Sequence, residues 1–216
     1  MIYYRIKTYY KKSYGGDFVL ERKFKELVTF YNGVNTTRAE SQLGITSDVK
    51  YYDQKSFEAD YYYKSVEGEI PPIKAPKDDN NLFLKVGDVV ISNTLNLATI
   101  IKENNANKLL THNFTKVEFK GNELNKEYFI YLFNENKYIK RQKERKRQGS
   151  SILKIPTRIL EDVSAPVIPL DEQVKVGGIY TEVLKLKGKL EDYSCLMEQI
   201  TSRLLEKAVE GANIHD

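Results

Sequence analysis

The C-terminal part of the chain has the most regular pattern of apolar positions. After Pro169, apolar residues recur at alternating steps of 3 and 4 as far as Leu204. This spacing is typical of a coiled-coil helix, which buries one apolar stripe against a partner helix. Three further leucines, Leu184, Leu196 and Leu205, widen the stripe and indicate contacts with more than one neighbour. We call the stripe the seam; it comprises Val176, Ile179, Val183, Leu186, Leu190, Tyr193, Met197, Ile200 and Leu204.

The seam predicts one long helix across residues 169–211. At about 1.5 Å per residue such a helix spans roughly 60 Å, which is more than one small domain can cover. We therefore expect the seam to pair with a second helix instead of lying wholly on its own domain. Gly177 and Gly178 together lower the helix propensity by roughly 2 kcal/mol, so we expect a kink or fraying near the start.

The preceding residues mix β and helical patterns. Runs rich in β-branched residues predict strand structure at 82–92 and 97–102, with a turn at Gly87-Asp88 between apolar runs. Alternation predicts a strand at 114–119, and a further strand is expected at 152–155. An apolar helical face that continues into a basic run predicts a single helix across 124–147.

These elements define the expected domain organisation. The fold class is α+β, with a predominantly β domain at residues 1–168, the long helix at 169–211 and a short tail at 212–216. Residues 164–169 contain two prolines and are expected to form an extended connector between the domain and the helix.

Charge is concentrated in one stretch. The chain has 34 basic and 30 acidic residues, but residues 137–147, KYIKRQKERKR, contain seven basic residues and one acid. Without this stretch 34 − 7 = 27 basic and 30 − 1 = 29 acidic residues remain, a net charge of −2. Such a density of positive charge attracts phosphates. A solvated helix face is the alternative interpretation.

Candidates for catalysis or metal binding are few. The two histidines, His112 and His215, and the single Cys195 have no partners at a recognisable spacing, and no phosphate-binding loop or dinucleotide motif is present. We therefore expect no catalytic residue and no metal site. A metal-dependent nuclease built on Asp88 and Glu118, with Lys120 supporting the attacking water, is a weaker alternative.

Several further features indicate where in the cell the protein works and what it binds. No apolar run approaches the roughly 18–20 residues of a membrane helix, and no secretory signal is present, so we expect a cytoplasmic protein without a membrane partner. Eleven of the sixteen tyrosines fall within the first 63 residues. Tyrosine is favoured in strands, and this interpretation outweighs a base-stacking platform because no aromatic RNA-binding signature accompanies them.

The ordered series of segments resembles the specificity subunit of type I restriction-modification systems. The series runs through ERKFKELVTFYNGVNTTRAE, LKVGDVVIS, EYFIYLF with its basic continuation, GSSILKIPTRILEDVSAPVIPLDEQ and the long helix. These segments span nearly the whole chain, from about residue 21 to residue 211. The order and spacing of the segments carry the resemblance, since none is specific alone.

The resemblance implies a non-catalytic subunit that reads duplex DNA. A modification subunit would use S-adenosylmethionine to methylate adenine, and a restriction subunit driven by ATP and Mg²⁺ would cut unmodified DNA; this chain would bind no cofactor. A full subunit of the family carries two target-recognition domains and two long helices that pack antiparallel. This sequence has one of each, so we expect a half subunit that forms a homodimer through the seam and reads a palindromic bipartite target.

Two segments supply the candidate DNA contacts. The YNGVNTTRAE segment offers polar side chains on an expected loop, suited to base edges or phosphate, although an ordinary surface loop is equally consistent. The basic stretch and the residues after it are candidates for contacts with the DNA backbone. The candidates are Asn35, Thr36, Thr37 and Arg38 in the first segment, and Lys137, Lys140, Arg141, Lys143, Arg145, Lys146, Arg147, Gly149, Ser150 and Ser151 in the second. A coiled-coil interaction protein with a basic nucleic-acid-binding segment is the main alternative.

Overall fold

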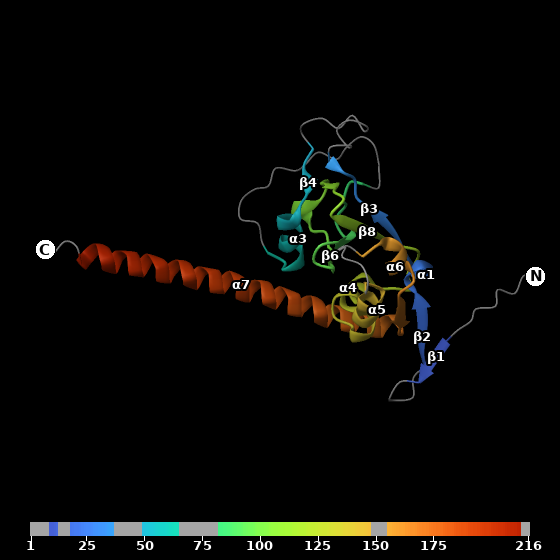
Figure 1. The fold of residues 1–216 in the computed structure, drawn as a ribbon. Helices are drawn as coiled ribbons and strands as arrows, with labels where there is room; N and C mark the ends of the chain where they lie inside the picture. Colours follow the sequence, from blue (N-terminus) through green and yellow to red (C-terminus); the bar gives the residue numbers. More distant parts are fainter. Residues whose placement is uncertain (1–8, 13–17, 37–48, 65–81, 148–154, 213–216) are drawn as a thin grey trace, which may run out of the picture.

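A β-rich domain and one long helix that projects from it make up the described part of the chain (Figure 1). The computed structural model describes residues 9–12, 18–36, 49–64, 82–147 and 155–212. The combination of a mixed domain and a C-terminal helix confirms the predicted α+β class.

The central sheet is antiparallel and has the strand order β3-β8-β5-β6. Its strands are β3 (Val28–Asn32), β5 (Val89–Ser92), β6 (Leu97–Ile100) and β8 (Phe114–Phe119). All four residues of β5 are buried, because the strand lies between two neighbours in the middle of the sheet. The turn predicted at Gly87 and Asp88 is present: Gly87 has a φ of 82°, and β5 follows it.

A second antiparallel sheet has the order β1-β2-β9. It contains β1 (Tyr9–Lys12), β2 (Phe18–Lys23) and β9 (Ser164–Val167). The segment predicted as a connector therefore forms a strand, which pairs with β2 from Ser164 opposite Lys23 to Val167 opposite Leu20. Pro166 is tolerated because β9 lies at the edge of its sheet.

Short elements complete the domain. A small parallel pair joins β4 (Tyr51–Tyr52) to β7 (Leu109–Leu110). The short helices are α1 (Phe24–Leu27), α3 (Gln54–Tyr61), the 3₁₀ turn η1 (Glu103–Asn105) and α6 (Thr157–Glu161).

The single helix predicted across 124–147 is wrong, because the structure divides it into two. The first is α4 (Lys126–Asn134) and the second is α5 (Lys137–Arg147). Asn136 starts the second helix: its side-chain oxygen accepts hydrogen bonds from the backbone nitrogens of Tyr138 and Ile139, at 3.0 and 3.2 Å. The side chain of Asn134 exchanges two hydrogen bonds with the backbone of Ala98 and so holds the end of α4 against β6.

Aromatic side chains join α4 to helix α1 and to the central sheet. The ring of Phe129 lies 5.2 Å from that of Phe24 and 5.6 Å from that of Phe119, between ring centroids. Phe24, Phe129 and Phe133 are all completely buried. Burial of these large rings contributes much of the core's stability and fixes α4 as the platform on which the long helix lies.

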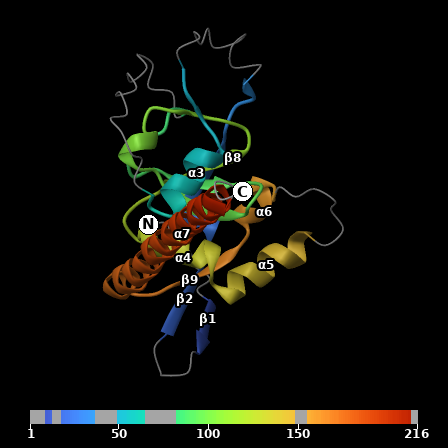
Figure 2. The same cartoon turned by 90° about the vertical axis from the view of Figure 1, so that its left-hand side faces the viewer.

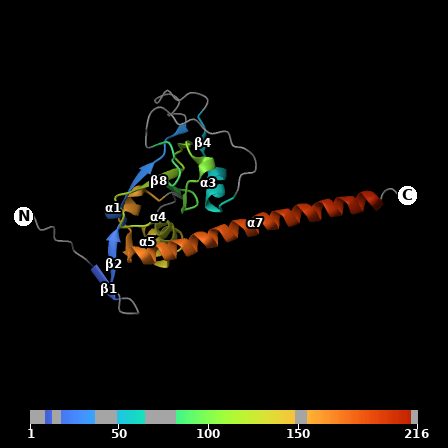
Figure 3. The same ribbon diagram turned by 180° about the vertical axis from the view of Figure 1, so that it is seen from behind.

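The long helix is α7 (Leu170–Ala212), a continuous element of 43 residues. Its first part packs on α4 and passes beside α3, and its remainder extends beyond the domain (Figures 1 and 3). Every side chain described from Lys189 to Glu210 is exposed. The kink or fraying expected at Gly177 and Gly178 does not occur.

Candidate nucleic-acid interface and helix seam

The outward face of α5 carries a row of cations. Lys137, Arg141 and Arg145 are exposed and recur every fourth residue, so they lie on one side of the helix. Among the described residues, none of the three is held in an ion pair. Exposed Glu144 also lies toward this face and offsets part of the charge. The row can therefore approach a polyanion without first breaking an internal contact.

The inward face of α5 holds two of the predicted DNA-contact lysines in internal contacts. The ammonium nitrogen of Lys143 donates a 2.7 Å hydrogen bond to the Phe133 carbonyl and lies 3.7 Å from the centroid of the Phe133 ring. Lys143 is only 6% exposed. The ammonium nitrogen of Lys140 lies 2.9 Å from a carboxylate oxygen of Glu135. These two lysines anchor α5 to the domain.

A second contact fixes how α5 sits on the domain. The side-chain amide of Gln142 donates to the carbonyl oxygen of Ser164 at 2.8 Å and accepts from its backbone nitrogen at 2.9 Å. This pair of hydrogen bonds ties α5 to strand β9, from which the chain leads directly into α7. The row of cations and the start of α7 are thus attached to the same strand.

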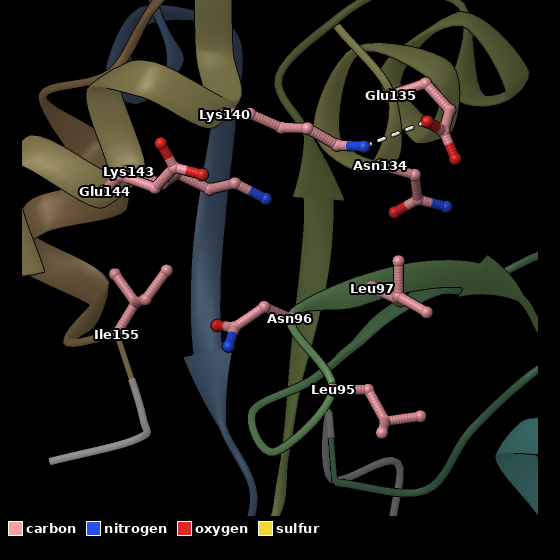
Figure 4. A pocket seen from close by; sticks show the side chains of 9 residues that line it. All are labelled: Leu95, Asn96, Leu97, Asn134, Glu135, Lys140, Lys143, Glu144 and Ile155. Carbon is pink, nitrogen blue, oxygen red and sulfur yellow. Dashed lines mark hydrogen bonds and ion pairs between the residues drawn. The ribbon is translucent and has the colours of Figure 1, made fainter. Parts of the chain in front are cut away.

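An open cavity of about 370 Å³ separates α5 from the turn between β5 and β6 (Figure 4). Side chains of both signs line it, including Lys140, Lys143, Glu135 and Glu144. The ion pair between Lys140 and Glu135 crosses one side of the cavity. This mixture of charges gives the cavity no preference for an anion.

The described start of the polar YNGVNTTRAE segment, residues 31–36, lies at another end of the domain from α5 (Figure 2). Asn35 and Thr36 follow β3, and Asn35 is exposed. The described parts of the two predicted contact segments are therefore not brought together. Thr37, Arg38, Gly149, Ser150 and Ser151 lie outside the described residues, as do the side chains of Lys146 and Arg147 at the end of α5.

The seam is the exposed face of α7. Its members from Ile179 to Leu204 are all between 42% and 68% exposed, and only Val176 is partly covered. The stripe predicted to seek a partner helix is thus not used by the domain itself. Whether another helix pairs with it stays a prediction.

A different stripe of α7 contacts the domain, and sequence reasoning missed it except for Leu184. It consists of Gln173, Gly177, Tyr180, Thr181, Leu184 and Gly188, all buried. At about 100° per residue, this stripe and the seam point roughly 140° apart. Its members are mostly small or polar, so hydropathy does not reveal it; the two glycines, three turns apart in a long helix, were the available signal.

Gln173 is the central contact of the domain-facing stripe. Its side-chain oxygen accepts from the backbone nitrogen of Asn125 at 2.8 Å, and its side-chain nitrogen donates to the carbonyls of Glu123 and Ile168 at 2.9 and 2.8 Å. Two turns along, Tyr180 packs against Tyr131 of α4, and burial raises the pKa of the Tyr180 hydroxyl. The hydrogen bonds of Gln173 satisfy buried polar groups where α4 and α7 begin.

The three residues of the nuclease alternative form ion pairs or hydrogen bonds with other parts of the domain. The ammonium nitrogen of Lys116 lies 2.6 Å from a carboxylate oxygen of Asp88, and Glu118 accepts a 2.8 Å hydrogen bond from the Tyr31 hydroxyl. The ammonium of Lys120 donates to the Lys25 carbonyl. No cluster of three potential metal ligands occurs among the described residues. The same part of the chain contains no helix able to span a membrane.

Comparison with solved structures gives matches to chains from type I restriction-modification systems. The chain matches the HsdS subunit of Thermoanaerobacter tengcongensis with a TM-score of 0.45 and 15% identity, over 79% of this chain and 38% of that one. It matches the type I restriction-modification S subunit of M. genitalium with a TM-score of 0.49 and 14% identity, over 87% and 44%.

A third match gives a TM-score of 0.52 at 14% identity, over 85% of this chain and 43% of the other. It comes from a structure of the complex assembly and conformational transition of the type I R-M system. No protein-family model and no curated protein sequence matches the chain. The fold therefore resembles that of the third solved chain. This chain spans less than half the length of each of the three solved chains.

Proposed function

We propose that this protein is a sequence-specific DNA-binding specificity subunit of a type I restriction-modification complex. The observation that carries the proposal is the outward row of cations on α5, Lys137, Arg141 and Arg145, which suits contact with a DNA backbone. The shared fold supports the same assignment. The subunit itself is non-catalytic and cytoplasmic; it directs adenine methylation and restriction by partner subunits, which bind S-adenosylmethionine, Mg²⁺ and ATP.

The proposal includes a homodimer formed through α7. The seam leaves a long apolar stripe exposed, and a second copy of the chain offers an identical stripe. Two-fold pairing would place two identical reading domains on one DNA molecule, so the target would be bipartite and palindromic. Because both copies have the same spacing of apolar side chains, pairing of the two seams is the simplest way to bury this surface.

Binding of duplex DNA by the purified chain tests the proposal. Replacing Arg141 and Arg145 with alanine, singly and together, should weaken affinity for a pool of duplex DNA. Each lost phosphate contact should reduce the slope of log affinity against log salt by about 0.9. The matched control is Arg203→Ala, which removes the same charge from the exposed C-terminal part of α7.

The outcomes separate the candidate functions. An unchanged salt slope in the Arg141, Arg145 double variant would remove α5 from the DNA interface. A chain that dimerises but binds neither duplex DNA nor a co-expressed methyltransferase subunit would instead favour a coiled-coil interaction protein, which the exposed seam also suits. Co-purification with a methyltransferase chain encoded beside it is the most direct test of the proposed complex.

A further inference from the structure

Two glycines seat α7 directly on the backbone of the domain. A β-carbon added at Gly177 would lie 2.6 Å from the backbone nitrogen of Tyr128, and one added at Gly188 would lie 1.9 Å from the carbonyl oxygen of Tyr62. At Gly178, by contrast, an added β-carbon would have no atom of the described domain within 4 Å. Only glycine permits the two close approaches, and two points of contact define the direction of a rigid helix.

The contact beneath Gly188 is itself firmly held. Tyr62 caps the end of α3, and the adjoining Asp60 is only 1% exposed. The Asp60 carboxylate accepts hydrogen bonds from the Tyr52 hydroxyl at 2.8 Å and from the backbone nitrogen of Lys102 at 3.1 Å. Because retreat of α3 would break these buried hydrogen bonds, α7 has to move if the contact becomes tighter.

Side chains around Gly188 hold α7 in place. The ammonium nitrogen of Lys185 lies 5.4 Å from the centroid of the Tyr63 ring. The ammonium nitrogen of Lys64 lies 3.2 Å from a carboxylate oxygen of Glu191 and 3.6 Å from one of Asp192. These are the last contacts before the helix leaves the domain, so they and the two glycines fix the direction of its projecting part (Figure 3).

We propose that Gly188, seated on the Tyr62 carbonyl, is a specificity-determining residue that sets the spacing between the two half-sites of the DNA target. The inference rests on the proposed function: if two copies pair through the seam, the angle between each domain and its α7 fixes where the second domain lies. Gly188 acts through this angle and touches no DNA itself.

The expected displacement follows from the geometry. Ordinary contact begins at 3.4 Å, so a β-carbon 1.9 Å from the Tyr62 oxygen requires a shift of α7 of about 1.5 Å. Gly188 lies about 16 Å along the helix from Gly177, so the tilt is about 5°. At Glu206, which lies about 44 Å from Gly177, the tilt moves the helix by about 4 Å. This is comparable with the roughly 3.4 Å rise of one base pair.

A distance between two spin labels tests the angle without DNA. In a Cys195→Ser background, labels at Lys55→Cys on α3 and Glu206→Cys on α7 report the separation within one chain when labelled protein is diluted with unlabelled protein. Gly188→Ala should lengthen the separation by a part of the roughly 4 Å displacement at Glu206, because that displacement lies across the helix axis. The matched control Gly178→Ala should leave it unchanged, since its new methyl group meets nothing. An unchanged separation in Gly188→Ala would overturn the inference.

A second variant covers the case in which Gly188→Ala does not fold. Lys64→Glu places a negative charge beside Glu191 and Asp192, and because these side chains are at least a third exposed the domain should still fold. Repulsion should weaken the contact between α7 and the domain and broaden the distribution of label separations. A distribution as narrow as that of the wild type would show that these contacts do not hold α7 in its direction.

Selection of targets from a random pool of duplex DNA links the angle to specificity. Gly188→Ala should keep the half-site sequences of the wild type but change the preferred spacer by about one base pair. An altered label separation with an unchanged spacer would overturn this inference alone. A wild-type chain that selects no bipartite target would overturn the proposed function and the inference with it.

Discussion

Dimerisation through the seam can be abolished by a defined set of substitutions. Replacing Leu190, Met197 and Ile200 together with glutamine keeps good helix formers while removing three apolar side chains that are 59%, 46% and 43% exposed. Full burial of such a side chain contributes about 1.5–3 kcal/mol, so covering the exposed half contributes roughly 1 kcal/mol each. Six side chains in a dimer give roughly 6 kcal/mol, which corresponds to a loss of affinity of about 10⁴-fold.

Sedimentation equilibrium across micromolar concentrations measures this loss directly. The wild type should be a dimer and the triple variant a folded monomer, with circular dichroism checking that the domain is intact. The control replaces Val174 and Val209 with glutamine, which removes exposed apolar surface outside the seam and should weaken the dimer far less. A wild type that stays monomeric at these concentrations, or a seam variant that dimerises as tightly as the wild type, refutes the pairing.

Two further predictions concern the stability of the domain and of α7. Gly178→Ala should raise the free energy of unfolding by about 1 kcal/mol because the position is open and helical. Gly177→Ala should lower the free energy of unfolding, since the new β-carbon would lie 2.6 Å from a backbone nitrogen of α4. Urea unfolding compares the two variants, and equal effects would contradict the close approach at Gly177. Hydrogen bonds from Lys23 and Lys25 lower the pKa of Asp162 from its ordinary 3.8 to about 2. The stabilisation from this carboxylate is therefore fully present above about pH 4 and is lost as the pH falls toward 2, so Asp162→Asn should be less stable than the wild type near neutrality and converge with it in acid. A stability difference independent of pH between 2 and 5 would argue against this ion pair.

The sequence was sufficient to predict elements whose side chains repeat with a clear period. The seam predicted α7 almost to its ends, and alternation predicted β8 at Phe114–Phe119. The break between α4 and α5 was missed because the helical pattern continues across it: Phe133 and Ile139 are both completely buried, on either side of Asn136. What ends α4 is the pair of hydrogen bonds from Asn134 to a distant strand, which local periodicity does not contain.

The candidate DNA contacts were predictable only as a region of charge. Composition located the basic stretch, but it could not separate Arg141 and Arg145, which face outward, from Lys143, which is committed to the Phe133 carbonyl and ring. The difference arises from the orientation of α5, which is set by the contact of Gln142 with Ser164, twenty-two positions along the chain. A charge count treats these side chains alike because it contains no information on that contact.

The two stripes of α7 explain why only one of its surfaces could be read from the sequence. A stripe that pairs with another helix needs apolar side chains, so hydropathy reveals the seam. A stripe seated on backbone needs small residues and hydrogen-bonding groups, so Gly177, Gly188 and Gln173 look like defects in a coiled coil. Since the stripes point in different directions, substitutions in the seam should change association while leaving the angle of α7 intact. Substitutions at Gly188 should do the reverse, and this separation allows the two roles of the helix to be tested independently.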